Sequence, residues 1–440
     1  MTRTFAGSLV YLILYNIVMK NKILLTLVTF LFSFAAKAQE QRCGFTHKPN
    51  LEQEKIIKQL INPKGQSNAR TEEKTYTIPV LFHIIQTDNS ADFVNKITKT
   101  QIDEQLKVIN EDYNRLNADT IYTPNIFKSL AGKITINFML AKIDTNYTIF
   151  KEEGIIRHSK FLNKNRTNTE FDEEIKKQTI RNPNQYLNIW VYKNVIYSLS
   201  GKPMLGYAQF PDFSNLQGLN NIGGISNTDG VAIAARSFKN VEERKTNTNV
   251  WLGAIYGRTL SHEIGHFLGI LHTFSDIEGL CADNDFCEDT PKLRDNTNGC
   301  NPLDKNKCET IAMPENFMDY TNDACMNLFT KCQVERMKLV LEKCPRRKEL
   351  TTSTVTSVRD ENLAANVSIF PNPTNAFFTI KTENLQIKNL KIFSVLGQQV
   401  YENNAIQANT NIDISHLSKA IYVLKIETER GMLTKKLVLE

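Results

Sequence analysis

Three histidines and a glutamate between residues 262 and 272 have the types and spacing that bind a metal ion and activate water. His262 and His266 are four residues apart, so on a helix their imidazoles project from one face and reach the same ion. Gly269 accepts a positive φ at no steric cost, which ends the helix and lets His272 supply a third nitrogen. Three protein ligands leave a fourth position for water, as at a catalytic zinc, whereas a structural zinc is closed by protein ligands.

Glu263, the neighbour of the first histidine, is the predicted general base. Zinc lowers the pKa of its water towards ~7 and polarises a carbonyl group. Glu263 would take the proton of that water and deliver it to the leaving amine. The pattern therefore predicts hydrolysis of peptide bonds without a covalent intermediate. Chance spacing in an ordinary packing helix is the alternative; a match at five specified positions is a roughly one-in-ten-thousand event over a chain of this length.

The elements that must position these side chains follow from the hydrophobic pattern. A helix over residues 249–268 is predicted to lead into the histidines. A second helix is predicted at residues 100–115, where apolar residues recur at helical spacing. Strands rich in apolar and β-branched residues are predicted at 76–86, 134–143, 187–195 and 230–235. Strands with intervening helices predict an α/β unit.

The first 38 residues have the composition of an export signal. Two lysines precede an apolar run over residues 23–36, and Ala36-Lys37-Ala38 fits a small-x-small cleavage site. The run is shorter than the ~20 residues that span a bilayer. An uncleaved anchor that also uses the apolar run at residues 9–19 is the alternative. We expect export and no permanent membrane span.

The net charge does not indicate a nucleic-acid-binding protein. Of the formal charge of +6, four positive charges lie in residues 1–38, which leaves +2 for the rest of the chain. No clustered basic stripe accompanies it, so nucleic acid is not an expected partner.

All eight cysteines follow the expected signal, and seven lie between residues 281 and 344. An even, clustered set in an exported chain is typical of disulfides. A structural zinc knot is the alternative, but no CxxC pair is present to form one.

The string HExxHxxGxxH over residues 262–272 resembles the zinc motif of the metzincin clan of metalloproteases. Metzincins carry a methionine turn beneath the zinc, and the sequence NFMDY at residues 316–320 resembles one. The resemblance implies that Met318 forms an apolar floor under the histidines. It also implies that Tyr320 lies beside the metal and stabilises the oxyanion. A gluzincin, with a distant glutamate as third ligand, is disfavoured by the spacing of His272 and by this turn.

Further stretches of the sequence are similar to those of the pappalysin family. They are HTF at residues 272–274, DTP at 289–291, and CMNLFT at 325–330 followed by Gln333 and Arg336-Met337. The resemblance covers residues 76–350. It implies a metzincin-like α/β catalytic domain whose cleft separates an upper half, with a sheet and the zinc helix, from an irregular, disulfide-tied lower half.

The same resemblance implies a calcium site in the loop after the zinc motif. Asp285 and Thr290 match ligand positions, together with a carbonyl group near Cys287, which stands where an apolar residue is usual. An acidic loop that is merely solvated is the alternative.

Two disulfides are implied by the pappalysin resemblance, Cys281–Cys308 and Cys300–Cys325. Of the remaining cysteines, Cys332 and Cys344 would lie about 18 Å apart on one helix, at ~1.5 Å per residue. A disulfide requires Cα atoms within ~7 Å, so Cys287–Cys332 is the favoured third pair.

Residues 366–440 show a different pattern, in which seven short apolar runs alternate with turn sequences. This predicts a small all-β sandwich. The stretches IFPNPT at 369–374, IFSVLG at 392–397 and GMLTKKLV at 431–438 resemble the C-terminal sorting domain of type IX secretion cargo. The resemblance implies passage through the outer membrane of a Gram-negative bacterium, with the type IX machinery as partner. A substrate-binding accessory module is the alternative.

Cys43 lies ahead of the catalytic unit, just after the expected signal. A thiolate is a strong zinc ligand and would occupy the position that catalysis needs for water. The sequence Arg-Cys-Gly at residues 42–44 resembles the cysteine switch of metzincin propeptides, without its longer flanking motif, and this implies a latent precursor. A disulfide between Cys43 and Cys344, which keeps the cysteine count even, is the alternative.

These observations predict a secreted or cell-surface zinc endopeptidase that acts on proteins or peptides. The expected organisation is a signal peptide (1–38), a propeptide (39–75), the catalytic domain (76–350), a linker (351–365) and the sorting domain (366–440). An adhesin on an inactive protease scaffold is the rival, but all four residues of the zinc motif are present. The preferred peptide bond stays open, because Asp323 beyond the methionine turn would favour a basic residue, bind calcium or face solvent.

Overall fold

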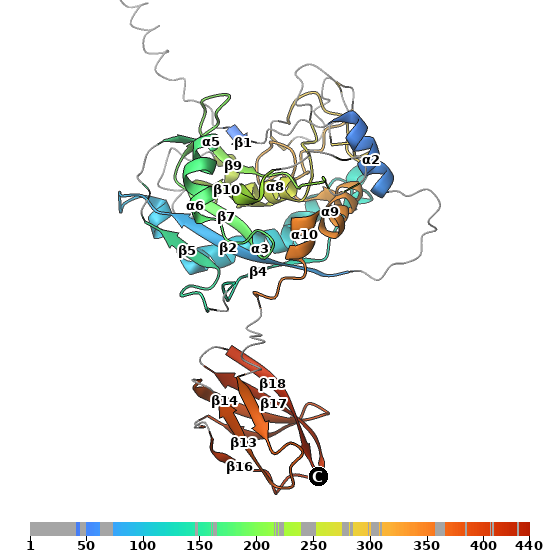
Figure 1. Ribbon diagram of the computed structural model, residues 1–440. Helices are drawn as coiled ribbons and strands as arrows, with labels where there is room; N and C mark the ends of the chain where they lie inside the picture. The colour runs from blue at the N-terminus through green and yellow to red at the C-terminus, as the bar shows by residue number, and fades with distance from the viewer. Residues whose placement is uncertain are drawn as a thin grey trace, which may run out of the picture.

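The computed structural model describes residues 41–44, 50–61, 74–238, 252–356 and 366–440, with short gaps at 146–147, 160, 162–164, 215, 217–218, 220–223, 275–280, 282–284, 298, 301–307, 309, 383–384, 405, 407–408 and 429–430. The expected signal peptide, part of the expected propeptide and most of the expected linker lie outside these residues. The described chain forms a catalytic unit and a C-terminal unit, each with its own hydrophobic core (Figure 1).

The helices are α2 (Leu51–Ile61), α3 (Lys99–Tyr113), α4 (Asn125–Lys128), α5 (Asn168–Phe171), α6 (Lys177–Thr179), α8 (Arg258–Phe267), α9 (Lys331–Lys343) and α10 (Pro345–Leu350). The strands of the catalytic unit are β1 (Gln41–Cys43), β2 (Tyr76–Ile85), β3 (Ala131–Gly132), β4 (Ile136–Leu140), β5 (Ile155–His158), β6 (Arg166–Thr167), β7 (Leu187–Tyr192), β8 (Val195–Ile196), β9 (Met204–Ala208), β10 (Val231–Ala234) and β11 (Phe329–Thr330).

A seven-stranded mixed sheet forms the upper half of the catalytic unit. Its order is β1-β9-β10-β7-β2-β4, and β5 also pairs with β2. Strand β2 is buried almost throughout and runs parallel to β4, β5 and β7, as expected for an apolar, β-branched strand covered on both faces. Strand β9 is antiparallel to β10, and β1 adds to the outer edge of β9 in parallel.

Helix α8 carries the zinc motif and lies against β9 and β10 on one side and α3 on the other (Figure 1). Helix α3 begins with a capping box in which the side chains of Thr98 and Gln101 satisfy backbone N–H groups. Its Tyr113 hydroxyl donates to the carbonyl oxygen of Ser261 over 2.9 Å, and its Gln105 amide donates to that of Gly257 over 2.8 Å. These bonds fix the position of α8 relative to α3.

The expected helix over residues 249–268 is too long, because α8 begins at Arg258. Gly257 has φ 80°, a left-handed conformation that interrupts the helix, and residues 252–254 form a separate 3-10 turn. The carboxylate of Asp323 accepts hydrogen bonds from the amides of Tyr256 and Arg258 and so satisfies the start of α8.

The described residues between 285 and 328 in the lower half of the unit form no helix or strand, and this half is tied by disulfides. Cys281 is joined to Cys308, Cys287 to Cys332, and Cys300 to Cys325. These are the two pairs that the family resemblance implied and the third pair favoured by distance. Helices α9 and α10 follow and complete the unit. Its packing continues beyond the expected end at residue 350, because the side chain of Val355 is buried and its carbonyl oxygen accepts hydrogen bonds from the amides of Lys142 and Ile143.

The C-terminal unit is a sandwich of a three-stranded and a four-stranded sheet, as the seven short runs predicted. The strands are β12 (Val367–Phe370), β13 (Phe377–Thr382), β14 (Ile387–Ser394), β15 (Gln399–Asn403), β16 (Asn411–Asp413), β17 (Ala420–Thr428) and β18 (Gly431–Leu439). The orders are β12-β13-β16 and β15-β14-β17-β18, and alternate side chains of both sheets form one core.

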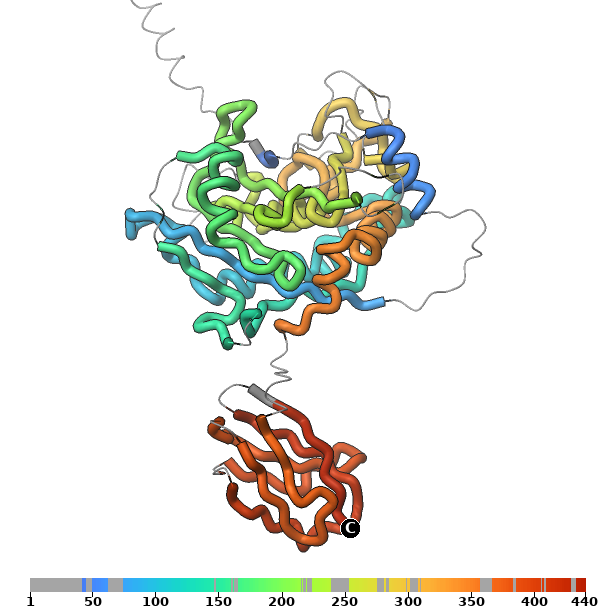
Figure 2. The backbone as a smooth tube through the Cα atoms, in the orientation of Figure 1, coloured from blue at the N-terminus to red at the C-terminus, as the bar shows by residue number. Residues whose placement is uncertain are grey.

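The N-terminal segment, residues 41–61 as far as they are described, contributes two elements to the catalytic unit. Strand β1 is the edge strand described above. Helix α2 lies beside α9, although the two are far apart in the sequence (Figure 2). The sequence pattern did not predict α2, in which Ile57 is the only apolar side chain that is fully buried.

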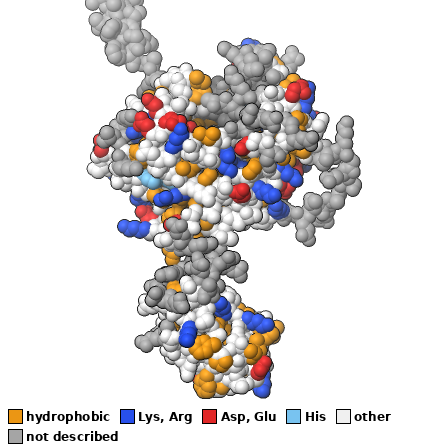
Figure 3. Space-filling model, viewed as in Figure 1, with side chains coloured by type: hydrophobic (Ala, Val, Ile, Leu, Met, Phe, Trp, Pro, Cys, Tyr) orange, Lys and Arg blue, Asp and Glu red, His pale blue; other side chains and the backbone are white. Residues whose placement is uncertain are grey.

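No helix in the described part of the chain is long and apolar enough to cross a membrane. On the face shown in Figure 3, basic and acidic side chains are interspersed over the described surface of the catalytic unit.

Candidate metal centre and active site

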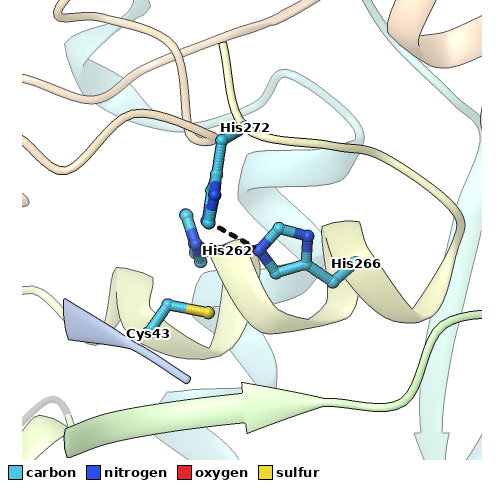
Figure 4. A group of neighbouring side chains, drawn as sticks. All are labelled: Cys43, His262, His266 and His272. Carbon is cyan, nitrogen blue, oxygen red and sulfur yellow. Dashed lines mark hydrogen bonds between the residues drawn. The ribbon is translucent and has the colours of Figure 1, made fainter. Parts of the chain in front are cut away.

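The three histidines converge as predicted, two from α8 and one from the turn that follows it (Figure 4). Gly269 has φ 86°, and the amides of Gly269 and Ile270 donate to the carbonyl groups of His266 and Gly265, which is the Schellman arrangement that ends a helix. The reversal brings Nε2 of His272 to 3.1 Å from Nε2 of His266. Nε2 of His262 lies 3.2 Å from Nε2 of His266.

Hydrogen bonds fix which nitrogen of each helical histidine faces the centre. Nδ1 of His262 donates to the carbonyl oxygen of Phe317, and Nδ1 of His266 donates to that of Ile270, each over 2.7 Å. Since a carbonyl only accepts, the proton of each neutral imidazole is on Nδ1 and the lone pair is on Nε2. Burial holds the pKa of His262 well below its ordinary value, so the ring is in the neutral form that binds metals.

This donor set fits a zinc ion. Unprotonated nitrogens repel one another at 3.1–3.2 Å unless a cation lies between them. With Zn–N bonds of about 2.0–2.1 Å, the nitrogens of a tetrahedral site lie roughly 3.4 Å apart. The sulfur of Cys43 points at the same centre from β1, and it and the three imidazole nitrogens all lie within 4.8 Å of one another (Figure 4).

Cys43 is therefore at the histidines rather than at Cys344. Cys344 is buried in a separate apolar cluster, and no disulfide joins the two cysteines in the described part of the chain. The alternative of a Cys43–Cys344 disulfide is wrong. Burial also raises the pKa of the Cys344 thiol to about 12, which keeps it protonated and unreactive.

Glu263 lies beside this centre and is fully buried. Its Oε2 is 3.4 Å from the sulfur of Cys43, while Oε1 has no hydrogen-bond partner among the described residues. Burial raises the pKa of Glu263 to about 8. The hydrogen bond with Cys43 and the positive charges of Arg42 and Lys176 act in the opposite direction and lower this pKa. A buried carboxylate oxygen without a donor is a position suited to water.

Met318 and Tyr320 both lie close to the residues that carry the histidines. Met318 is buried under α8 at Gly265, where a Cβ atom would come within 2.4 Å of its sulfur. Its turn also supplies the Phe317 carbonyl that orients His262. The ring of Tyr320 lies 4.8 Å from that of His272, and its hydroxyl donates to the carbonyl oxygen of Cys43 over 3.3 Å.

The side chain of Arg42 is buried beyond the methionine turn. Its Nη2 lies 2.7 Å from Oδ1 of Asp323, and its Nη1 donates to the carbonyl oxygen of Thr321 over 2.6 Å. The sulfur of Met326 also contacts Nη2, at 3.3 Å. Asp323 is fully buried, which excludes the solvent-exposed position that the sequence left open. No feature of the sequence near Arg42 indicated this pairing across 281 positions.

The oxygens of the expected calcium ligands lie close together. Oγ1 of Thr290 is 2.7 Å from Oδ1 of Asp285 and 2.8 Å from the carbonyl oxygen of Cys287. Gln333 on α9 donates to the other carboxylate oxygen of Asp285. Three hard oxygen donors from one loop thus meet beside the Cys287–Cys332 disulfide.

Comparison with known proteins identifies families and proteins that are similar to this chain. Residues 170–342 match the family described as pregnancy-associated plasma protein-A, and residues 368–440 match the secretion system C-terminal sorting domain. An extracellular metalloprotease of Verticillium alfalfae is 28% identical over 326 residues, which are 73% of this chain and 97% of the relative.

Mature mirolysin of Tannerella forsythia, solved in complex with a cleaved peptide, is 35% identical and matches 63% of this chain and 96% of that one with a TM-score of 0.51. The chain belongs to the pappalysin family. A promirolysin mutant of the same organism is 32% identical over 72% of this pappalysin and 98% of the mirolysin chain, with a TM-score of 0.55. This pappalysin is a secreted zinc-dependent metalloendopeptidase that hydrolyses peptide bonds, and its sorting domain directs it to the secretion machinery.

Proposed function

We propose that this pappalysin is made as a latent precursor and, after loss of its N-terminal segment, cleaves proteins on the amino side of a basic residue, arginine above lysine. The observation that carries the proposal is the buried pairing of Arg42 with Asp323 beside the three histidines. It supports a specificity pocket that the N-terminal segment fills in the precursor.

The pocket has the donor and acceptor pattern of an arginine site. The guanidinium group is planar and carries five N–H donors, and here they reach a carboxylate and a carbonyl at once. An ammonium group is a point charge and does not reproduce that fork. Once Arg42 leaves, a substrate arginine can take its place. A neutral side chain would leave Asp323 buried without a counter-charge, which is strongly unfavourable.

The catalytic roles proposed for the site follow from its geometry. His262, His266 and His272 hold the zinc ion, which when bound polarises the scissile carbonyl and the attacking water. Glu263 accepts the proton of that water at Oε1 or Oε2 and then delivers it to the leaving amine.

Two residues of the methionine turn complete the proposed site. The Tyr320 hydroxyl, released from the carbonyl of Cys43, donates to the developing oxyanion. Met318 supports the histidines from below and takes no part in proton transfer.

Latency is proposed to follow from the same contacts. The thiol of Cys43 lies where the water must enter and next to Glu263. Its backbone is held by the pairing of β1 with β9 and by the amide of Gly44, which donates to the carbonyl oxygen of Gly206 over 2.9 Å. Arg42, one residue earlier, closes the specificity pocket. Residues 39–75 are accordingly proposed as the propeptide.

A calcium ion is the proposed second cofactor. Asp285, Thr290 and the carbonyl group of Cys287 supply neighbouring oxygens, and the ion would stabilise the irregular loop after the zinc motif.

The experiment that tests the cleavage preference is a profile of the activated, zinc-loaded enzyme on a proteome-derived peptide library. The proposal expects arginine to dominate the position after the cut, with lysine second and neutral residues at least tenfold poorer in kcat/KM. A profile with no preference for basic residues at that position would contradict it.

A further inference from the structure

A buried ion pair attaches helix α2 of the N-terminal segment to the catalytic unit. Nη1 and Nη2 of Arg336, on α9, donate to the two carboxylate oxygens of Glu54 over 2.5 and 2.8 Å. Each side chain is only 3% exposed. Two parallel charge-assisted hydrogen bonds make this the most specific form of arginine–carboxylate contact.

The same guanidinium also holds the turn of the zinc motif. Nε of Arg336 donates to the carbonyl oxygen of Gly269 over 2.5 Å. Gly269 is the residue whose positive φ leads from α8 to His272. One side chain thus connects α2 to the loop that carries the third histidine.

An apolar contact accompanies the ion pair one helical turn further along α2. Ile57 is 1% exposed and belongs to the cluster that contains Phe210, Phe213, Leu271 and Leu339. Glu54 and Ile57 lie three residues apart and hence on one face of the helix. The pair of Lys58 with Glu288 is exposed and contributes little.

We propose that this surface, formed by Arg336, the Gly269 turn and the apolar residues around Ile57, is a binding site for α2 that retains the N-terminal segment after the chain has been cut between α2 and β2. The inference rests on the latency proposed above, because it concerns how that latency ends. The cut alone does not activate the enzyme. Dissociation of the segment does.

The physical reason is that hydrolysis of one peptide bond between α2 and β2 removes none of these contacts. To leave, the segment must separate a buried carboxylate from a buried guanidinium and expose Ile57 to water. Loss of a buried, hydrogen-bonded charge pair acts mainly on the dissociation rate. The site therefore recognises an amphipathic helix with a glutamate followed three residues later by an aliphatic side chain, and the segment of this chain provides it.

The test uses the full-length precursor with a recognition sequence for an unrelated, specific protease placed between residues 62 and 73. After the cut, gel filtration reports whether the N-terminal fragment stays with the enzyme, and turnover of an arginine-containing peptide reports activity. Glu54→Gln removes the ion pair without a change in shape. Glu52→Gln, an exposed glutamate on the same helix, is the matched control. Ile57→Ser tests the apolar contact, and repetition in a Glu263→Gln background excludes self-digestion as the cause of fragment loss.

The cut wild type and the Glu52→Gln precursor are expected to keep the fragment and remain latent. In the cut Glu54→Gln and Ile57→Ser precursors, release is at least about tenfold faster, and activity appears at the rate at which the fragment is lost. Uncut Glu54→Gln stays latent. Immediate separation of the wild-type fragment, or equal release from Glu54→Gln and Glu52→Gln, overturns the inference. Activity in the uncut wild type would instead overturn the latency on which it rests.

Discussion

The sulfur of Cys43 lies 3.4 Å from Oε2 of Glu263, so one side chain of the N-terminal segment meets both the proposed base and the histidine cluster. Substitution of Cys43 by alanine removes the zinc-binding thiol and leaves space for water. The Cys43→Ala precursor is therefore expected to process itself while the wild type remains intact, as followed by gel electrophoresis and peptide turnover.

The matched control is Cys344→Ala, which removes the chain's other thiol outside the disulfides and is expected to stay latent. Mercurials that capture the Cys43 thiol should activate the wild type in the same way. Latency of Cys43→Ala equal to that of the wild type would exclude the cysteine as the cause.

Glu263→Gln is expected to bind zinc and fold normally while kcat falls by at least about 10²-fold, because the amide cannot accept the proton of the water. Metal analysis, circular dichroism and kcat measured on the same sample separate these effects. Wild-type turnover in a zinc-loaded, folded variant would rule out Glu263 as the base.

Asp323→Asn is expected to remove the preference for arginine. Loss of one partner of a buried charge pair costs 2–5 kcal/mol, so kcat/KM for arginine-containing peptides should fall by roughly 30-fold or more while that for neutral peptides is maintained. The asparagine side-chain oxygen can still accept from the amides at the start of α8. An unchanged preference for arginine in this variant would show that Asp323 does not form the pocket.

Removal of calcium by a chelator that spares zinc is expected to lower Tm by roughly 5–10 °C, since a tightly bound ion contributes several kcal/mol to the folded state. Asp285→Asn should reproduce most of the shift, whereas Glu335→Gln, an exposed acid on α9, should not. A melting temperature that calcium does not affect would indicate that the disulfides alone hold this loop.

The free energy of unfolding is expected to fall in acid partly through His83. Burial lowers the pKa of His83 to about 3, below the ordinary value of 6.5 that it regains on unfolding. Its contribution is complete above pH ~6.5 and is lost as the pH falls towards 3, by up to about 1.4 kcal/mol per pH unit, because the unfolded chain binds the proton first.

Trp190 provides the readout for this titration because its ring stacks on that of His83 at 5.2 Å. Denaturant unfolding followed by tryptophan fluorescence between pH 7 and 4 should show a shallower pH dependence for His83→Gln. The exposed His416→Gln serves as control and should match the wild type. Identical slopes in all three proteins would contradict the assignment.

The zinc motif could be predicted because its information is local. The spacing of His262 and His266 on a helix, the positive φ of Gly269 and the return to His272 all lie within 11 residues. Helix α3 and the strands β2, β4, β7 and β10 were also predicted to within a few residues, since apolar periodicity sets them, whereas β5 and β9 of the same sheet were not predicted. The family resemblance supplied two of the disulfide pairs.

The remaining features depend on pairs that are distant in sequence. The pattern before the zinc motif predicted a helix from residue 249, but Gly257 and the amide bonds to Asp323 start it at Arg258. The role of Arg42 could not be predicted, because it depends on the contact with Asp323. In the same way, nothing in the sequence around Glu54 indicated its pairing with Arg336, which lies 282 positions away. Charged side chains usually indicate a solvated surface, and only the fold shows which of them are buried together.

The two roles of the Asp323 carboxylate limit how the cleavage specificity of this protease can be changed. Its Oδ1 holds the arginine side chain, while Oδ2 receives the two amides at the start of the helix that carries His262 and His266. Selectivity and the alignment of the metal ligands thus share a single carboxyl group. Directed evolution that removes this group outright would loosen the catalytic centre, whereas changes to the Met326 side chain, whose sulfur contacts Arg42, leave these two amide bonds in place. New specificities are therefore more accessible through Met326, with an oxygen acceptor kept at position 323.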